Sequence, residues 1–294
     1  MSGGIKRFIL LAGWPLLLFS QVPPQLPTAP HENAGQDITG ALEGWFKNPD
    51  NTFSILLGYF NRNLKQTIDI PVGVNNHIDP GGPDQGQPTH FLPGRQWGLF
   101  TITVPKDFGD KKLTWTLVAN GRTDVIPLSL NPLWEISPFK EISMGNTPPS
   151  MAFNPAGPFV QGPRPITTTL NATVGEPVAI DVWAADDAKL LEGVKKAPKF
   201  PPLALTWSEF RGPGQVTFSK EKPELEKADF KVPEGAGDKV RGKATTMATF
   251  SEPGEYVLRV VANDWSGEGG FGFQCCWTNA MVKVSVKPAA TQSK

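Results

Sequence analysis

The chain has 294 residues, which is enough for two domains of ordinary size. Its 28 Lys and Arg balance 28 Asp and Glu, so it carries no broad positive field that would attract nucleic acid or anionic lipid. With 30 Gly and 30 Pro the chain has few windows for an uninterrupted helix, and this composition favours an all-β protein rich in turns.

The N-terminus has the pattern of a secretory signal peptide over residues 1–20. Lys6 and Arg7 precede an apolar run of 12 residues, from Phe8 to Phe19, which is too short to span a bilayer comfortably as a helix. No clean small-residue cleavage motif follows, so an uncleaved membrane anchor is the alternative. Residues 21–37 are a proline-rich leader that we expect to be extended. We therefore expect a secreted or periplasmic protein that, after cleavage, is not an integral membrane protein.

Residues 38–142 are predicted to form an N-terminal β-sandwich. Runs of apolar and β-branched residues predict strands at 52–60, 66–70, 97–104, 113–119 and 124–130. The last two flank Asn120-Gly121, a pair that readily takes positive φ and is typical of a two-residue hairpin turn. Short strands at this density are typical of a small sandwich.

A long loop is predicted at residues 71–96, and its stretch 75–95 is the best candidate for a functional site in this domain. Loops longer than about 12–15 residues without secondary structure are usually functional or disordered. Its candidate residues for contact with a ligand or partner are Asn76, His77, Asp79, Asp84, His90 and Arg95. The two His and two Asp are also ligand types that suit zinc, although their spacing matches no recognised metal-binding motif. The plainest alternative is a rigid loop whose polar side chains satisfy its own backbone.

A second β-sandwich is predicted at residues 166–288. A proline-rich segment at 143–165 is the expected linker, and residues 289–294 are the expected tail. Strands are expected at 167–172, 177–184, 256–262 and 280–286. Both faces of the 256–262 strand are largely apolar, which favours a strand buried between two layers.

Four segments of this second domain resemble PKD-type Ig-like repeats of secreted bacterial proteins. They are L-T-W at 205–207, G-P-G-Q-V-T-F at 212–218, A-T-T-M-A-T-F at 244–250 and P-G-E-Y-V-L at 253–258. The resemblance covers roughly residues 165–288 and implies an Ig-like sandwich without implying an activity. The chain departs from the family in lacking the W-D-F-G-D-G core and in carrying a charged insert at 219–243.

The first domain is similar to a group of uncharacterised secreted bacterial proteins. The shared segments are G-Y-F-N-R-N at 58–63, P-G-G-P-D-Q-G-Q-P-T-H-F at 80–91 and V-P-K-D-F-G at 104–109. This similarity implies a bacterial source and supports the domain boundary, and it implies no activity.

Cys275 and Cys276 are the only cysteines of the chain. Free thiols are uncommon in an oxidising compartment, so a disulfide between these neighbours is one prediction, with two buried thiols or intermolecular bonds as alternatives. A vicinal disulfide would present a stiff apolar surface beside Trp277, which we treat as a second candidate contact.

Three aspartates, Asp186, Asp187 and Asp264, follow predicted strands of the second domain. Loops at the end of a sandwich can bind calcium, but three carboxylates fall short of the six to eight oxygens that calcium takes. Ordinary turn aspartates are the alternative reading. The tryptophans at 45, 134, 183, 207 and 265 are expected in the core, with one or two as a sugar-stacking platform as the alternative.

The sequence contains no recognised motif of a serine hydrolase, a zinc protease or a phosphate-binding loop. The interpretation is two tandem antiparallel β-sandwiches of Ig-like or PKD-like type that act as a non-catalytic binding or assembly module. The expected partner is an envelope protein or polysaccharide, recognised without a cofactor or with calcium, and nucleic acid is not expected. The alternatives are a metal-dependent hydrolase that uses the His77–His90 loop and a structural spacer.

Overall fold

The computed structural model describes residues 32–141, 145–163, 166–189, 201–265 and 275–290. The expected signal peptide and residues 21–31 of the expected leader lie outside these residues, as do the last four residues of the expected tail. The part of the chain that the structure describes is all-β, with one 3₁₀ turn at Pro132–Trp134. No helix in that part is long and apolar enough to cross a membrane.

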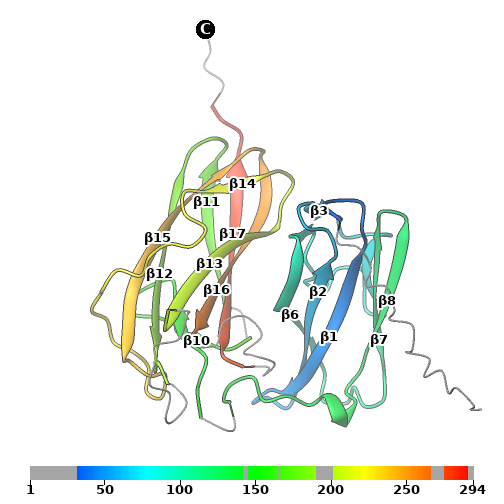
Figure 1. The fold of residues 1–294 in the computed structure, drawn as a ribbon, viewed down its shortest axis with the longest axis horizontal. Helices are drawn as coiled ribbons and strands as arrows, with labels where there is room; N and C mark the ends of the chain where they lie inside the picture. Colours follow the sequence, from blue (N-terminus) through cyan, green and yellow to red (C-terminus); the bar gives the residue numbers. More distant parts are fainter. Residues whose placement is uncertain (1–31, 142–144, 164–165, 190–200, 266–274, 291–294) are drawn as a thin grey trace, which may run out of the picture. The chain divides into compact units, whose positions relative to one another are not determined.

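The N-terminal sandwich consists of two three-stranded sheets (Figure 1). One has the order β1-β2-β6, with β1 at Ile38–Lys47, β2 at Phe53–Asn61 and β6 at Gly94–Val104. The other has the order β4-β7-β8, with β4 at Asn76–Asp79, β7 at Leu113–Ala119 and β8 at Arg122–Leu128. A short separate pair consists of β3 (Ile68–Asp69) and β5 (His90–Phe91).

The core of this sandwich follows from the alternation of side chains along its strands. In β7, Leu113, Trp115 and Leu117 are buried, whereas the residues between them are only half-buried. Trp115 meets Phe100 of β6 edge to face, with ring centroids 5.3 Å apart. Burial of each large apolar side chain contributes about 1.5–3 kcal/mol, so this contact between sheets is a main source of stability.

The predicted hairpin is confirmed, but β1, β4 and β5 were not predicted from the sequence, and the last two lie within residues 71–96, which were expected to be a loop. Ala119 pairs with Arg122, and the turn residues Asn120 and Gly121 have φ of 48° and 76°, as a type I′ turn requires. β1 was not predicted because two glycines interrupt the run of apolar side chains in its sequence. One of them, Gly44, has φ of 136° and lies at a bulge in the β1–β2 pairing.

The C-terminal sandwich consists of a five-stranded and a four-stranded sheet, with order β10-β9-β12-β15-β14 and β11-β17-β16-β13. The strands of the first are β9 (Ser150–Ala152), β10 (Val160–Gln161), β12 (Val178–Asp186), β14 (Val216–Phe218) and β15 (Val240–Phe250). Those of the second are β11 (Ile166–Thr173), β13 (Leu203–Arg211), β16 (Gly254–Asp264) and β17 (Trp277–Lys287).

The strand order of this second sandwich is that of the immunoglobulin fold. β9, β12, β15 and β14 lie side by side like strands A, B, E and D, and β13, β16 and β17 lie like C, F and G. β11 runs parallel to β17, while the other recorded strand pairs are antiparallel. The expected Ig-like fold is therefore confirmed by topology.

A tyrosine corner, another feature of Ig-like sandwiches, lies at the start of β16. The buried Tyr256 donates a hydrogen bond from its hydroxyl to the backbone oxygen of Glu252, at 2.9 Å. Gly212 makes room for the ring, because a Cβ there would lie 2.2 Å from Tyr256 Cδ1. The hydroxyl thus fixes the turn between β15 and β16 to the strand that follows.

Tyr256→Phe is expected to lower the free energy of unfolding by about 1 kcal/mol, because it removes one partly buried hydrogen bond and leaves the ring in place. Urea denaturation followed by circular dichroism measures the change. Thr245→Val is the control, since its hydroxyl bonds Asp181 on an exposed face and its loss should matter less. Equal midpoints for Tyr256→Phe and the wild type would contradict the role of the corner.

Residues 143–165, expected to be a linker, contain two strands of the second sandwich. β9 pairs with β12, and β10 pairs with β9 at the edge of the sheet. The backbone N–H of Gly162 also donates to Thr278 Oγ1 of β17, at 2.9 Å. Pro155 and Pro158 lie between these short strands and the other prolines of the segment flank them in sequence, at a sheet edge where a missing donor is tolerated. This segment is therefore part of the sandwich and not a free connection.

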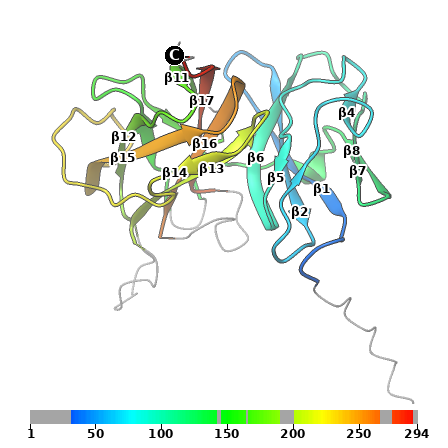
Figure 2. The same ribbon diagram turned by 90° about the horizontal axis from the view of Figure 1, so that it is seen from above.

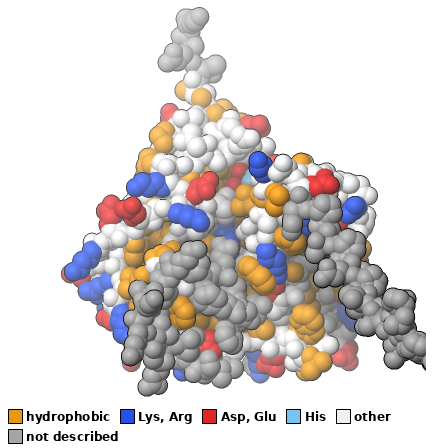
Figure 3. Space-filling view, in the orientation of Figure 1, with side chains coloured by type: hydrophobic (Ala, Val, Ile, Leu, Met, Phe, Trp, Pro, Cys, Tyr) orange, Lys and Arg blue, Asp and Glu red, His pale blue; other side chains and the backbone are white. Residues whose placement is uncertain are grey.

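The charged insert at 219–243 carries apolar anchors that were not predicted. Phe230 is buried and stacks on Phe159, with ring centroids 5.6 Å apart, and Ala236 is also buried. Acidic and basic side chains are mixed along the left edge of Figure 3, on the side where Figure 1 shows β12 and β15. The insert thus combines a solvated charged surface with apolar contacts that hold it to the sandwich.

Candidate functional site

The loop at 71–96 lies against the second sandwich. Thr89 N–H donates to the backbone oxygen of Phe210 in β13, at 3.1 Å, and Phe210 packs into the core of the first sandwich. Arg211 donates to Asp84 through two nitrogens, at 2.8 and 3.1 Å, and to the backbone oxygen of Gln87, at 2.6 Å. Figure 2 shows β13 next to β5 and β6. Hydrogen bonds at Asp84, Gln87 and Thr89 thus hold one side of the loop against β13.

The bidentate ion pair with Arg211 alters the acidity of Asp84. The hydrogen bonds from Arg211 lower the pKa of Asp84 below its usual value, although partial burial acts in the opposite direction. Asp84 is therefore held as a carboxylate at neutral pH, and its role in the structure is to tie the loop to β13. Because the Asp84 side chain is half exposed, water screens this pair and its contribution to stability is small.

Two glutamines that were not predicted hold the loop in one conformation. Gln85 Nε2 donates to three backbone oxygens of the loop, among them those of Ile78 and Pro80 at 3.0 and 3.1 Å. The buried Gln87 donates to the backbone oxygen of Pro83 at 2.6 Å, and its own Oε1 accepts from Gln85 N–H. A polar residue amid glycines and prolines is the only sequence signal for such a role.

The six residues predicted as one contact site do not converge. Asn76 is fully buried, where it donates to the backbone oxygens of Ile70 and Pro88 and accepts from Trp115. His77 and His90 each face a different aspartate, since His77 Nε2 lies 3.3 Å from Asp79 and His90 Nδ1 lies 2.7 Å from Asp69. Within the described ranges, no group of three or more His, Cys, Asp or Glu is placed to hold a metal ion.

The tip of the loop, residues 79–86, is exposed to solvent, as are Pro71, Val74 and Asn75 near its start. Asp79 to Asp84 and Gly86 are exposed, and Gln85 is half-buried beneath them. The tip includes a cis peptide bond between Asp79 and Pro80. An exposed segment on a hydrogen-bonded support is already ordered before any partner arrives.

Arg95, also predicted as a contact residue, belongs to a buried network behind the loop. Its Nη2 lies 2.6 Å from Glu43 Oε1, and Glu43 Oε2 accepts from the backbone N–H of Gly98 at 2.6 Å. Burial raises the pKa of Glu43, although the charge of Arg95 acts to lower it. The Arg95 guanidinium also stacks on Trp97, 4.0 Å from the ring centroid. Arg95 is therefore a structural residue and not a free surface cation.

Gly98 is a point of tight contact between the two sandwiches. A Cβ at this glycine would lie 2.1 Å from Cζ2 of Trp277, and Asn279 Nδ2 donates to its backbone oxygen at 2.5 Å. Trp277 is buried together with Leu56 of the first sandwich and Val261 of the second. The two sandwiches therefore share a buried joint.

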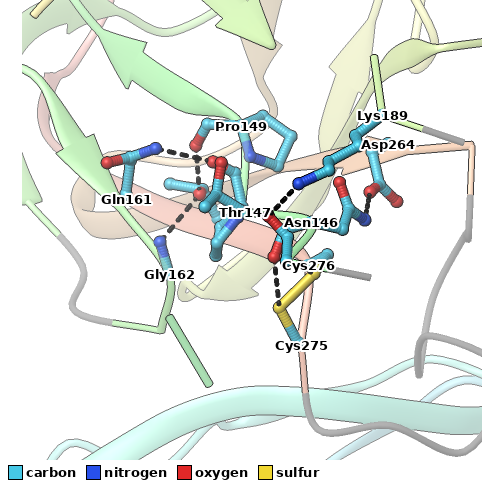
Figure 4. The surroundings of a disulfide bond; sticks show 12 residues. Asn146, Thr147, Pro149, Gln161, Gly162, Lys189, Asp264, Cys275 and Cys276 are labelled. Atoms are coloured by element: carbon cyan, nitrogen blue, oxygen red, sulfur yellow. Dashed lines mark hydrogen bonds between the residues drawn. A yellow bond between two sulfur atoms is a disulfide. The ribbon is translucent and has the colours of Figure 1, made fainter. Parts of the chain in front are cut away.

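Cys275 and Cys276 form a vicinal disulfide (Figure 4), so this alternative among the three is the one in the structure. Both sulfurs face the backbone oxygen of Asn146, at 3.9 and 3.7 Å, and both residues are buried. The expectation that the disulfide and Trp277 present an apolar surface to a partner is wrong, because the Trp277 ring is inserted beneath Gly98.

The disulfide should be visible chemically. Unfolded, unreduced protein is expected to take up no iodoacetamide, whereas reduced protein takes up two equivalents, and mass spectrometry measures both. A Cys275→Ser/Cys276→Ser variant controls for labelling elsewhere. Two alkylated cysteines without reduction would indicate buried thiols, and dimers on a non-reducing gel would indicate intermolecular bonds.

The three predicted aspartates lie at one corner of the second sandwich. Asp186 and Asp264 are buried, and burial, followed by the charges of Asp264 and Asp187, raises the pKa of Asp186 to about 8. Asp187 accepts from Thr147 Oγ1 at 3.1 Å and from Lys189 N–H at 3.0 Å. Asn146, which the sequence did not single out, donates from Nδ2 to Asp264 Oδ2.

The predicted tryptophans are mostly core residues. Trp45, Trp207 and Trp265 are buried, and Trp183 is half-buried under Lys243. Trp134, on the 3₁₀ turn, is 48% exposed, and Trp97, which was not predicted, is 36% exposed.

Comparison with known proteins adds little to the topology. No family model matches the chain, and no curated protein matches it. Among solved structures, the SrpA adhesin from Streptococcus sanguinis is 14% identical, with a TM-score of 0.27 over 50% of this chain and 61% of the adhesin. The D00-D0 domain of intimin is 14% identical, with a TM-score of 0.24 over 84% of this chain and 99% of that domain. Domains 4 and 5 of the S-layer protein SbsC are 9% identical, with a TM-score of 0.22 over 85% and 98%. At these scores the fold assignment rests on the strand order.

Proposed function

We propose that this chain is a secreted or periplasmic, non-catalytic binding module that recognises an envelope protein or polysaccharide through the loop tip at residues 79–86. The observation that carries the proposal is the exposure of this tip on a support of side-chain hydrogen bonds from Gln85, Gln87 and Asn76. A loop that is ordered before binding loses less conformational entropy when it binds, which favours affinity. Loops carried on a rigid β-scaffold are a common place for recognition.

The disulfide and the N-terminal segment support a location outside the cytoplasm. A disulfide between Cys275 and Cys276 suits an oxidising compartment outside the cytoplasm. The charged and apolar N-terminal segment has the pattern of a secretory signal. The resemblances to PKD-type repeats and to secreted proteins of uncharacterised function point to the bacterial envelope as well.

The proposal is tested by binding to the isolated cell envelope of the source bacterium. Asp79→Arg places a bulky cation at the exposed tip while it leaves Gln85 and Gln87 intact, and it is expected to reduce retention of the bound envelope component strongly. Asp107→Arg is the matched control, because Asp107 is an exposed aspartate in another turn of the same sandwich. Thermal unfolding shows whether both variants remain folded.

Three outcomes would be informative. Loss of one specific protein or polysaccharide with Asp79→Arg but not with Asp107→Arg supports recognition by the tip. Equal retention by all three proteins places the contact elsewhere and contradicts the proposal. No retention by the wild type contradicts it too, and favours a spacer whose buried joint holds the two sandwiches in line.

A further inference from the structure

β11 is a long edge strand that lacks the usual protection against pairing with another chain. It is bonded to β17 on one side, without a bulge, and no described strand pairs with its other side (Figure 2). Its eight residues, Ile166–Thr173, include no charged residue and no proline. The free side of such a strand presents backbone N–H and C=O groups that can pair with a further strand.

The other edge strands of the described sheets are short, charged, irregular or covered. β3, β5 and β10 have two residues, β14 has three and β4 has four. β8 carries charged residues and Pro127, and β1 and β6 each have a bulge in their pairing with β2. β13 has a bulge too, and Thr89 of the loop at 71–96 donates to the backbone oxygen of its Phe210. β11 is the exception, so its open edge calls for an explanation.

The apolar side chains of β11 are incompletely covered at this edge. Val284 and Val286 of β17 are buried, whereas Leu170 and Ala172, which lie opposite them in β11 and pack against the same core, are only half-buried. A hollow of about 310 Å³ lies at the end of the strand, lined by the last residues of β11, the turn after it and the start of β12. A strand added to β11 would remove part of this apolar surface from water, which favours association.

The alternation of side chains along β11 allows the strand to pair with its own copy. Positions 167, 169 and 171 are exposed, whereas positions 168, 170 and 172 are half-buried. Residues opposite each other in an antiparallel pair point to the same face, so exposed positions have to meet exposed positions. A register with Thr169 opposite its own copy meets this condition. Thr168 then lies opposite Leu170, and no charged residue of either strand meets another.

We propose that two copies of this chain associate through β11, as an antiparallel pair with Thr169 at the two-fold axis. The pairing joins two four-stranded sheets into one continuous sheet of a size that open sheets commonly reach. The second copy is the partner of matching chemistry, because it supplies an uncharged strand with the same alternation. A two-fold contact uses the same patch on both chains, so the pair is closed and neither β11 edge stays open for further chains.

Two such chains carry two loop tips, so an envelope polymer with repeated sites would be held by two contacts at once. This consequence rests on the proposed function, whereas the pairing of β11 does not.

Sedimentation equilibrium of the full chain tests the pairing, and we expect a dimer that dissociates on dilution. Thr169→Lys and Thr169→Glu each place two like charges opposite each other at the axis, so each is expected to weaken the dimer about tenfold or more. Thr169→Lys should lose more, because Lys283 of β17 already lies beside this position. An equimolar mixture of the two variants is expected to form a heterodimer at least as tight as the wild-type dimer, since opposite charges then meet.

Thr217→Lys is the matched control, because it adds the same charge at an exposed threonine of β14, and it should dimerise like the wild type. Recovery in the mixture also separates loss of the contact from damage to the fold, since misfolded chains would not recover. A wild type that stays monomeric up to about 100 µM would overturn the proposal. So would a Thr169→Lys variant that dimerises as well as Thr217→Lys, or a mixture of the two Thr169 variants that fails to associate.

Discussion

Gly98→Ala is expected to lower the free energy of unfolding by about 3 kcal/mol, which is one of the two largest effects predicted for this chain. Two costs combine at this position. The backbone φ of Gly98 is +49°, a region that residues with a Cβ rarely occupy, and the new Cβ would lie 2.1 to 2.7 Å from three atoms of the Trp277 indole. The indole is rigid and buried, so it cannot yield by a small rotation, and the joint between the two sandwiches has to open.

Gly109→Ala separates the two costs. Gly109 has a similar φ of +55° in the same sandwich, but a Cβ there would meet nothing within 4 Å. This control should lose only the backbone term, about 1 kcal/mol. Urea denaturation followed by circular dichroism measures both variants, and calorimetry would show whether Gly98→Ala splits the unfolding into two transitions. A Gly98→Ala variant no less stable than Gly109→Ala would contradict the close packing of Trp277.

Glu43→Ala is expected to cost about 3 kcal/mol, because breaking a buried ion pair leaves the other charge uncompensated. Arg95 would lose its carboxylate, and the N–H of Gly98 would lose its acceptor. Burial raises the pKa of Glu43, while the charge of Arg95 and the hydrogen bonds from Gly98 and Arg95 act to lower it. Loss of the Glu43 carboxylate should also weaken the joint between the sandwiches, since the backbone oxygen of Gly98 accepts a hydrogen bond from Asn279.

A double-mutant cycle tests whether the loss comes from the uncompensated charge. Arg95→Met and the combined Glu43→Leu/Arg95→Met variant complete the cycle, with Glu43→Leu as the second single change. We expect the combined variant to be more stable than the sum of the single losses predicts, because it leaves no lone charge behind. Additive losses within about 0.5 kcal/mol would indicate that the two side chains act independently.

Local sequence signals account for most strands of the fold. Alternation in 113–119 and the Asn-Gly pair after it determine a hairpin whose paired residues are only a few positions apart. β1 was missed because it lacks such a local signal. Gly44 interrupts the alternation of side chains, and only pairing with β2 makes this segment a strand. Prolines made 143–165 resemble a linker, although pairing with β12 makes part of it an edge strand.

Long-range contacts decided the roles of the candidate residues. Arg211 and Asp84 are 127 positions apart in sequence, and no local pattern pairs them. Gln85 and Gln87 carry no motif, and their importance is visible only where the loop folds back over them. Asn76 and Arg95, taken as contact residues for their polarity, proved to be buried or paired within the fold.

The sequence by itself determined the all-β class, the Ig-like second half and the two cysteines that can pair with each other, because each depends on residues close together in the chain. Only the tertiary structure decided that Trp277 seals a joint at Gly98, that residues 79–86 form an exposed tip of the 71–96 loop and that Asn146 meets Asp264. The physical reason is that such contacts depend on strand register and on the packing of two sandwiches, which bring together residues that the chain itself keeps far apart.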